Sequence, residues 1–330
     1  MRRQRGYVLV LALASMALIA FVAANFSQRI DALRASAGSM RDEARARLAA
    51  ADALAVAQYW LASHAAQPMG YGDANGMVLA DGRFYRLPGG AVVAFQDLRG
   101  LLSVNIVDRP MLTRLLQQQG VTPEATDRYL DVLEDYTDLD HLKRLNGAER
   151  SGYADQGLPG PRNDFLRSLS ELALMPTWRD DVALVGRLRP LLSTSRGGWI
   201  NPNTAPVAVL RAVFPQAAPV QIERFVADRA LGQFDSPAQI TRSYGLPVGN
   251  EDILMFAGRE VQLTVWAPGL PQAIQYNLVL LPAGGTGPWL VTEQHLRARP
   301  QLRDDATDTQ PFPLAVAVTK REPAMGKDRP

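Results

Sequence analysis

Four carboxylates lie within one short stretch of the sequence, DYTDLDHLKRLNGAERSGY, and they are the residues best suited to chemistry. They are Asp135, Asp138, Asp140 and Glu149, at and after the end of a predicted helix. Carboxylates in one loop repel one another unless a positive charge lies among them, and hard oxygen ligands suit Ca²⁺ better than a transition metal. The glycine and closing glutamate of an EF-hand are missing at the required spacing. One interpretation is a calcium site. The other is a solvated acidic loop balanced by three cations, Lys143, Arg144 and Arg150.

The same carboxylates also permit an enzyme, a membrane-anchored periplasmic hydrolase that uses the acidic loop over residues 135–149. Such a site needs paired acids with separated pKa values in a cleft. The sequence holds no other catalytic pattern, because its three histidines, His64, His141 and His295, are scattered, and neither HExxH nor G-x-S-x-G occurs. The chain has no cysteine, which excludes disulfides, thiolate ligands and a cysteine nucleophile.

The length and charge of the chain exclude other classes of protein. A chain of 330 residues, 47% of them hydrophobic, can bury one or two cores. The 35 Lys and Arg residues barely exceed the 33 Asp and Glu residues, so no nucleic-acid partner is expected. Two asparagines, Asn105 and Asn203, each precede a predicted helix, which allows an interpretation as helix-hairpin-helix modules that bind DNA. However, Pro206 and Val207 occupy the turn that should present glycine amides to a phosphate, and two ordinary capped helices explain the pattern better.

A helical block must position the acidic loop, and strands lie on either side of it. Two strand-like segments within residues 77–97 flank Leu87-Pro88-Gly89-Gly90, a hairpin signal. Three further strand patterns follow residue 259, and the stretch between has helical periodicity. The predicted fold class is therefore α+β. Its predicted parts are a first portion of a sheet domain over 67–100, an inserted helical domain over 101–258, the rest of the sheet domain over 259–300, and a mobile tail over 301–330.

The chain begins with a basic segment, MRRQRG, followed by an uncharged run over residues 7–24. As a helix this run spans roughly 27 Å, close to the thickness of a bilayer core. The positive-inside rule places the leading arginines in the cytoplasm and the rest of the chain across the membrane. A cleavable secretory signal and a plain signal anchor are the alternatives, but no polar mature start follows the apolar run.

The same helix is predicted to continue to residue 66 as a stalk. Its C-terminal part carries an apolar stripe formed by Ala46, Ala50, Ala53, Leu54, Ala57 and Leu61. Glu43 interrupts the stripe upstream, so packing against a globular domain should begin near Ala46. We therefore expect residues 7–66 to be embedded in a membrane at one end and packed on a domain at the other.

RQRG followed by YVLVLALASMALIA resembles the class III leader of type IV pilins and type II secretion pseudopilins. The resemblance implies that residues 1–6 are a leader peptide, that a prepilin peptidase cuts between Gly6 and Tyr7, and that Tyr7 is then methylated. Most pilin-like subunits carry a glutamate at the fifth mature position, where it can neutralise the free amine of a neighbour. Here that position is Leu11. Since a charge in lipid needs a partner, the missing glutamate suggests a subunit at the tip.

Further motifs resemble the general secretion pathway protein K family, the large minor pseudopilins of the type II secretion system. They are Asp135-x-x-Asp138-x-Asp140, Gly147-Ala148-Glu149, Tyr153, Leu169-Ser170-Glu171-Leu172 and Ile200-Asn201-Pro202-Asn203-Thr204-Ala205. The resemblance implies a long pilin-like helix packed on an antiparallel sheet, with a large all-α, SAM-like domain inserted between strands and calcium bound there. Tyr136-Thr137 and residues 141–145 depart from the family pattern, which leaves the set of calcium ligands open.

The resemblance also implies a role in assembly without catalysis. The subunit is expected at the pseudopilus tip, initiating or capping assembly for protein export across the outer membrane. Its implied partners are minor pseudopilins I, J and H, the major pseudopilin below the tip, the prepilin peptidase and secreted proteins. The implied location is the inner membrane, with a single pass and the globular part in the periplasm.

Overall fold

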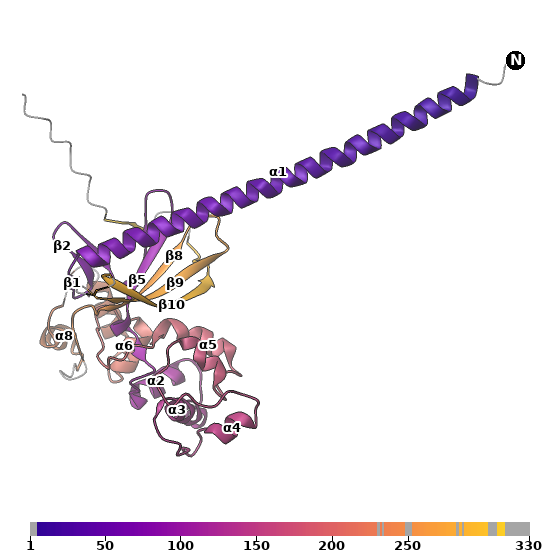
Figure 1. The fold of residues 1–330 in the computed structure, drawn as a ribbon. Coiled ribbons are helices and arrows are strands. Elements are labelled where there is room, and N and C mark those ends of the chain that lie inside the picture. Colours follow the sequence, from indigo (N-terminus) through magenta and orange to yellow (C-terminus); the bar gives the residue numbers. More distant parts are fainter. Residues whose placement is uncertain are drawn as a thin grey trace, which may run out of the picture.

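A long helix, α1 (Arg5–Ser63), extends far beyond the rest of the molecule (Figure 1). The computed structural model describes residues 5–229, 232, 234–247, 253–281, 284–285, 287–302 and 309–313. Within these, one helical segment, Tyr7–Ser63, is long and apolar enough to cross a membrane, and its most apolar window is not buried against any other part of the chain. The helix ends three residues before the predicted position, and the ring of His64 stacks on Trp60 with 3.7 Å between centroids.

The main sheet has six strands in the order β10-β9-β8-β5-β4-β11. Their bounds are β4 (Asp81–Arg86), β5 (Val92–Asp97), β8 (Glu260–Trp266), β9 (Gln272–Leu280), β10 (Trp289–Ala298) and β11 (Thr309–Pro311). The expected hairpin joins β4 to β5, and Gly89 and Gly90 take the positive φ angles, 94° and 88°, that such a turn requires. Strands β5 and β8 are antiparallel neighbours although the helical block separates them in sequence. The predicted α+β fold with a split sheet is confirmed.

The C-terminal segment differs from the prediction of a mobile tail over 301–330. Strand β11 pairs in parallel with β4, so the sheet is mixed rather than wholly antiparallel. Phe312 is buried next to this strand, with its ring 5.4 Å from that of Trp60 and 6.1 Å from that of Tyr85. The tail prediction is therefore wrong for residues 309–313, because a three-residue edge strand that ends in a proline carries no recognisable periodicity. Residues 303–308 and 314–330 lie outside the described part of the chain.

Alanines let the end of α1 lie directly on the sheet. The stripe predicted from the sequence faces β5 and β8, and Ala46 is its first buried residue, 4% exposed. Gly269 approaches the helix so closely that a Cβ there would lie 3.2 Å from that of Ala46. Packing thus begins where the sequence predicts. A small sheet, not predicted, follows α1 and consists of β1 (Ala66–Gln67), β2 (Gly70–Asp73) and β3 (Gly76–Leu79).

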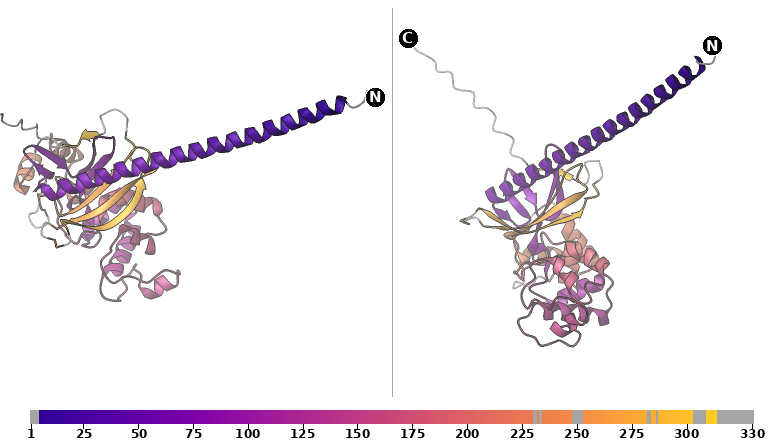
Figure 2. Two further views of the ribbon diagram at one scale, coloured as in Figure 1. Left: turned by 45° about the horizontal axis from the view of Figure 1, so that its top comes forward. Right: turned by 45° about the vertical axis from the view of Figure 1, so that its right-hand side comes forward.

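The inserted segment forms a helical domain on the face of the sheet opposite α1 (Figure 2). Its helices are α2 (Arg109–Gln118), α3 (Pro123–Thr137), α4 (Arg150–Ala154), α5 (Val182–Leu188), α6 (Val207–Val213), α7 (Pro219–Arg229) and α8 (Pro237–Tyr244). Three 3₁₀ turns, η1 (Leu98–Gly100), η2 (Leu169–Leu174) and η3 (Arg189–Leu191), and a parallel pair of short strands, β6 (Leu102–Ser103) and β7 (Leu192–Ser193), complete it. This domain has an apolar core of its own, separate from the core between α1 and the sheet. The sequence did not predict α4 and α8.

A fully buried carboxylate joins the two domains where the chain leaves and re-enters the sheet. Asp97, the last residue of β5, accepts hydrogen bonds from the backbone N–H groups of Arg99 (3.1 Å) and Gly258 (3.0 Å). It also accepts from the Asn201 amide (3.1 Å) and the Thr204 hydroxyl (3.0 Å), both in the helical domain. One side chain therefore bonds the end of β5, the segment returning to β8, and the helical domain.

The two asparagines that allowed a DNA-binding interpretation are buried structural residues. The Asn105 side chain donates to the carbonyls of Leu166 (3.0 Å) and Thr194 (2.8 Å). The Asn203 amide donates to the carbonyls of Phe234 (2.8 Å) and Met255 (3.1 Å). Both side chains form hydrogen bonds inside the protein, and the helices that follow are ordinary, with Asp108 and Pro206 rather than the asparagines at their N-caps.

Candidate functional site

The acidic loop connects α3 to α4. Helix α3 begins at a Thr122 cap with Pro123 in its first turn, which suits the fixed φ of proline, and it ends with Asp138 as its C-terminal cap. Glu149 occupies the N-terminal cap of α4, but its side chain makes no capping hydrogen bond. A carboxylate at this position normally accepts from the first turn of the helix. Glu149 is therefore directed elsewhere.

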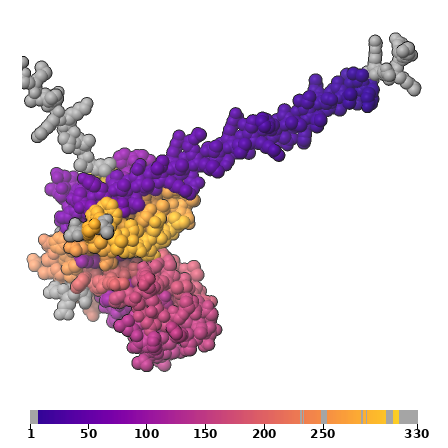
Figure 3. All heavy atoms as spheres, viewed as in Figure 1, coloured from indigo at the N-terminus to yellow at the C-terminus, as the bar shows by residue number. Residues whose placement is uncertain are grey.

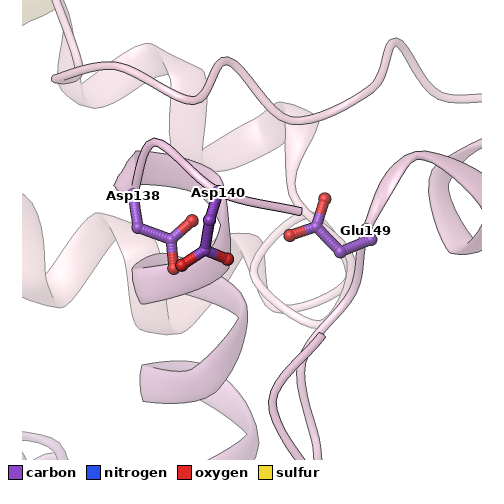
Figure 4. Close-up of side chains that lie close together, drawn as sticks. All are labelled: Asp138, Asp140 and Glu149. Atoms are coloured by element: carbon purple, nitrogen blue, oxygen red, sulfur yellow. The ribbon is translucent and has the colours of Figure 1, made fainter. Parts of the chain in front are cut away.

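Three of the four predicted ligands come together (Figure 4). Asp138, Asp140 and Glu149 each place a carboxylate oxygen within 4.8 Å of the other two. Glu149 is only 8% exposed, and among the described residues neither of its oxygens has a hydrogen-bond partner; Asp138 Oδ1 is also buried without one. Buried carboxylate oxygens without donors are costly unless a cation neutralises them. The three side chains fit a hard divalent cation such as Ca²⁺, which takes carboxylate ligands in flexible geometry.

The fourth predicted ligand, Asp135, is held differently. It is fully buried, and Arg144 Nη1 lies 2.7 Å from its Oδ1, while the backbone N–H of Arg144 also donates to the same carboxylate. Arg144 Nη1 contacts Asp138 as well, and its Nε lies 2.9 Å from Glu134 Oε2. Of the three cations named from the sequence, Arg144 thus lies among the acids. The sequence shows that Arg144 lies within the loop, but it does not show which carboxylates Arg144 pairs with.

Close packing holds the loop in place around Asp135. A Cβ at Gly147 would lie 1.9 Å from Asp135 Oδ2, so no other residue fits there without a shift. The Asn146 backbone N–H donates to Asp131 Oδ2 (3.0 Å), and Asp131 Oδ1 lies 2.7 Å from Arg109 Nη2. The motif around Gly147 therefore brings Glu149 back toward the end of α3.

The electrostatics of the cluster favour added positive charge. Burial raises the pKa of Glu149 above its ordinary value, and the negative charges of Asp135 and Asp138 raise it further. The same acids, together with Glu134, hold the pKa of the Arg144 guanidinium above its ordinary value, so this residue stays charged. The Arg144 guanidinium forms ion pairs with three carboxylates. Glu149 is not among its partners within the described contacts. A bound cation would counteract both burial and the neighbouring negative charges, and so would lower the Glu149 pKa.

A cavity of about 410 Å³ lies beside the loop. Its lining includes Arg128, Lys143, Ser151 and Asp180, and it does not include the three clustered carboxylates. A substrate seated in this cavity would not touch the acids that the hydrolase interpretation requires. The geometry therefore favours an ion site over an acid–base pair.

The residues expected to act in processing and assembly lie at the free end of α1. Gly6 is within the helix, Tyr7 is 74% exposed and Leu11 is 57% exposed. The rest of the predicted leader, residues 1–4, lies outside the described part of the chain. The expected cleavage, methylation and tip position stay predictions.

Comparison with known proteins yields two adjacent family matches and similar solved structures. Models of the type II secretion system protein K family match residues 94–195 and residues 200–251. These two segments cover most of the helical domain and its junction with β5. No curated protein matches the chain.

A similar solved structure is the crystal structure of the GspK-GspI-GspJ complex from the type II secretion system of enterotoxigenic Escherichia coli. A chain of that complex aligns over 82% of this chain and 100% of its own length, with a TM-score of 0.54 and 17% sequence identity. At this identity the match establishes a shared fold. The family matches, the shared fold and the N-terminal apolar helix support a minor pseudopilin of the type II secretion system. Residues 94–195 and 200–251 match the type II secretion system protein K family, and these matches support assigning the chain to it.

Proposed function

We propose that this protein is the tip subunit of a type II secretion pseudopilus, where it initiates or caps assembly together with minor pseudopilins I and J. The observation that carries the proposal is the placement of the helical domain. It adds a third layer to the α1-on-sheet body, on the side away from α1 (Figures 1 and 2). A subunit with this added bulk fits a filament only where no further subunit must stack above it.

The sequence of α1 supports the same position. The long unpacked part of the helix offers Leu11 where most pilin-like subunits have a glutamate. A subunit with no neighbour ahead of it needs no intramembrane carboxylate to pair with that neighbour's amine. The apolar run would hold the subunit in the inner membrane, with the sheet and helical domain in the periplasm, and would then pack with other helices in the filament.

The partners follow from the family and the fold. The similar structure is named as a complex of proteins K, I and J, which supports I and J as partners here. Protein H, the major pseudopilin, the prepilin peptidase and secreted proteins complete the proposed set.

The proposed cation is Ca²⁺, held by Asp138, Asp140 and Glu149. The ion would neutralise carboxylates that have too few donors and would tie the end of α3 to the start of α4. Asp135 would support the site through its pair with Arg144 rather than by direct ligation. The ion's role in this proposal is structural.

Mass and N-terminal sequence of the membrane-extracted protein test the pseudopilin assignment. Produced with the prepilin peptidase, the chain should begin at N-methylated Tyr7; without the peptidase it should begin at Met1. A start beyond residue 24, or a start at Met1 in both cases, would contradict the proposal and favour a plain anchor or a secretory signal.

Co-purification tests the tip position. The processed protein should form a complex with I and J and should nucleate filaments when they are present. The variant Leu11→Glu restores the usual carboxylate and should leave complex formation with the periplasmic parts unchanged while reducing initiation. Filaments that start equally well without this protein would contradict the role.

Calorimetric titration of the metal-stripped full chain with Ca²⁺ tests the ion site. Binding should be lost in Glu149→Gln, which keeps the shape of the side chain but removes its charge. The matched control is Asp155→Asn, an exposed carboxylate of the same domain, and it should bind as the unmodified chain does. Equal binding in both variants would place any ion elsewhere.

A further inference from the structure

Three leucines of the loop between α3 and α4 are almost fully exposed to solvent. Leu139, Leu142 and Leu145 expose 84%, 77% and 92% of their surface. A single exposed leucine on a soluble surface is ordinary, but three at every third position of one loop form a distinct apolar feature. We call this feature the leucine loop, residues 139–145.

The polar groups of this segment hold its backbone while the leucines point away. The Leu142 N–H donates to Asp140 Oδ1 (2.7 Å), and Arg144 is bound to Asp135 by both its backbone and its guanidinium. Asn163 donates to the Asp140 carbonyl and contacts His141 Nδ1 at 2.9 Å. The exposed leucines thus belong to a loop whose backbone is held by hydrogen bonds and an ion pair.

The charged groups of the loop differ in exposure. Asp138, Asp140 and Glu149 converge on one another, as Figure 4 shows; Glu149 is buried, Asp138 is half-buried and Asp140 is exposed. The exposed charged side chains beside the leucines are the cations Lys143 and Arg150 and the single carboxylate Asp140, so positive charge is in excess there. A surface that combines leucines and cations complements a lipid surface, which has an apolar interior beneath anionic headgroups.

The leucine loop joins α3 to α4, at the end of the helical domain that lies away from the sheet and α1. Figure 1 places α3 and α4 at the extremity of the helical domain, with the sheet between them and α1, and Figure 3 shows the same end in rose. A surface that the loop contacts is therefore distinct from the membrane crossed by residues 7–24.

We propose that the leucine loop inserts Leu139, Leu142 and Leu145 into an anionic phospholipid surface, a membrane other than the one that α1 crosses. Separate projecting side chains enter a deformable lipid interface readily, whereas a rigid protein partner needs a matching hole for each. With the proposed function, that surface is the periplasmic face of the outer membrane; this identification rests on the proposed function, but lipid binding itself does not.

A label on the loop tests the proposal. The chain has no cysteine, so Leu142→Cys provides a unique site for an environment-sensitive fluorophore. The labelled full chain is held by α1 in nanodiscs of neutral phosphatidylcholine and mixed with vesicles of phosphatidylethanolamine and phosphatidylglycerol. The matched control carries the label at Val182→Cys, on α5, where the side chain is 77% exposed. We expect a blue shift at position 142, weakened by salt, and none at position 182.

Substitutions in the leucine loop provide the second part of the test. With the label at 142, the pair Leu139→Ser and Leu145→Ser should lower the vesicle partition coefficient by at least about tenfold, since burying one leucine side chain is worth roughly 1.5 kcal/mol or more. The exposed pair Val182→Ser and Val220→Ser should leave it unchanged. All four residues are exposed, so folding, followed by circular dichroism, should not change.

Three outcomes would overturn the proposal. They are no shift with anionic vesicles, an equal shift at positions 142 and 182, and a shift that arises on adding minor pseudopilins I and J but not vesicles. The last would assign the loop to a protein partner. The assay needs no pseudopilus, so its failure leaves the tip assignment standing, and failure of processing at Tyr7 leaves lipid binding standing.

Discussion

Removing the carboxylate of Asp97 should loosen the joint between the sheet and the helical domain. The side chain is fully buried and accepts four hydrogen bonds, two from backbone N–H groups and two from side chains. In Asp97→Ala the side-chain donors, on Asn201 and Thr204, can turn to other partners. The backbone N–H groups of Arg99 and Gly258 cannot, because the chain direction fixes them.

The expected cost follows from those two groups. Each buried donor left without a partner costs about 1–3 kcal/mol, so Asp97→Ala should lower the free energy of unfolding by about 4 kcal/mol. Asp97→Asn keeps one acceptor oxygen for both N–H groups and should cost about 1–2 kcal/mol. The exposed control Asp155→Ala should change the value by less than about 0.5 kcal/mol.

Urea unfolding of the detergent-solubilised full chain measures these differences. The two domains have separate tryptophans, Trp60 in the sheet core and Trp178 in the helical core, so their fluorescence reports both. The unmodified chain should unfold with one midpoint, and Asp97→Ala should separate the two domains' transitions as well as lower stability. A loss below about 1 kcal/mol, or equal losses for alanine and asparagine, would refute the reasoning about backbone donors.

Three further perturbations test other parts of the structure. In the metal-free chain the raised pKa of Glu149 means that the native state holds a proton which the unfolded state releases, so the melting temperature should fall as pH rises above 4.5 through the raised pKa. Over the same window Ca²⁺ affinity should increase with pH. Glu149→Gln should abolish that increase and should reduce the fall in melting temperature, to which Asp97 also contributes because burial raises its pKa. Phe312→Ala should lower unfolding free energy by about 3 kcal/mol, because its buried ring packs on Trp60. Gly147→Ala should displace the Asp135 carboxylate and weaken Ca²⁺ binding at least tenfold by calorimetry.

Each of these has an outcome that contradicts it. A melting temperature that rises with pH over this window would reverse the assigned sign for Glu149. If Phe312→Ala unfolds like the unmodified chain, strand β11 is not part of the stable sheet. Unchanged Ca²⁺ affinity in Gly147→Ala would show that the close approach to Asp135 is not needed for the site.

The periodic features of the chain were predictable from its sequence. An uncharged run, an alanine stripe that starts at Ala46, and alternating strands after residue 259 each reflect a local rule about burial and spacing. The split of the sheet by a helical block followed from the same patterns. The short segments were not predictable: α4 has five residues and β11 has three, which is too few for a period to be detected.

The sequence by itself determined that the chain is an α+β protein with a helix long enough to cross a membrane, and that four carboxylates lie in one loop. It could not show which of those carboxylates pair with a guanidinium and which stay without hydrogen-bond donors, because that depends on which oxygens the folded loop brings together. Tertiary structure decided it: the close approach at Gly147 pairs Asp135 with Arg144 and leaves Glu149 buried beside Asp138 and Asp140 without donors. Spacing along the chain determines which carboxylates can come together, and packing determines which of them lack hydrogen-bond donors.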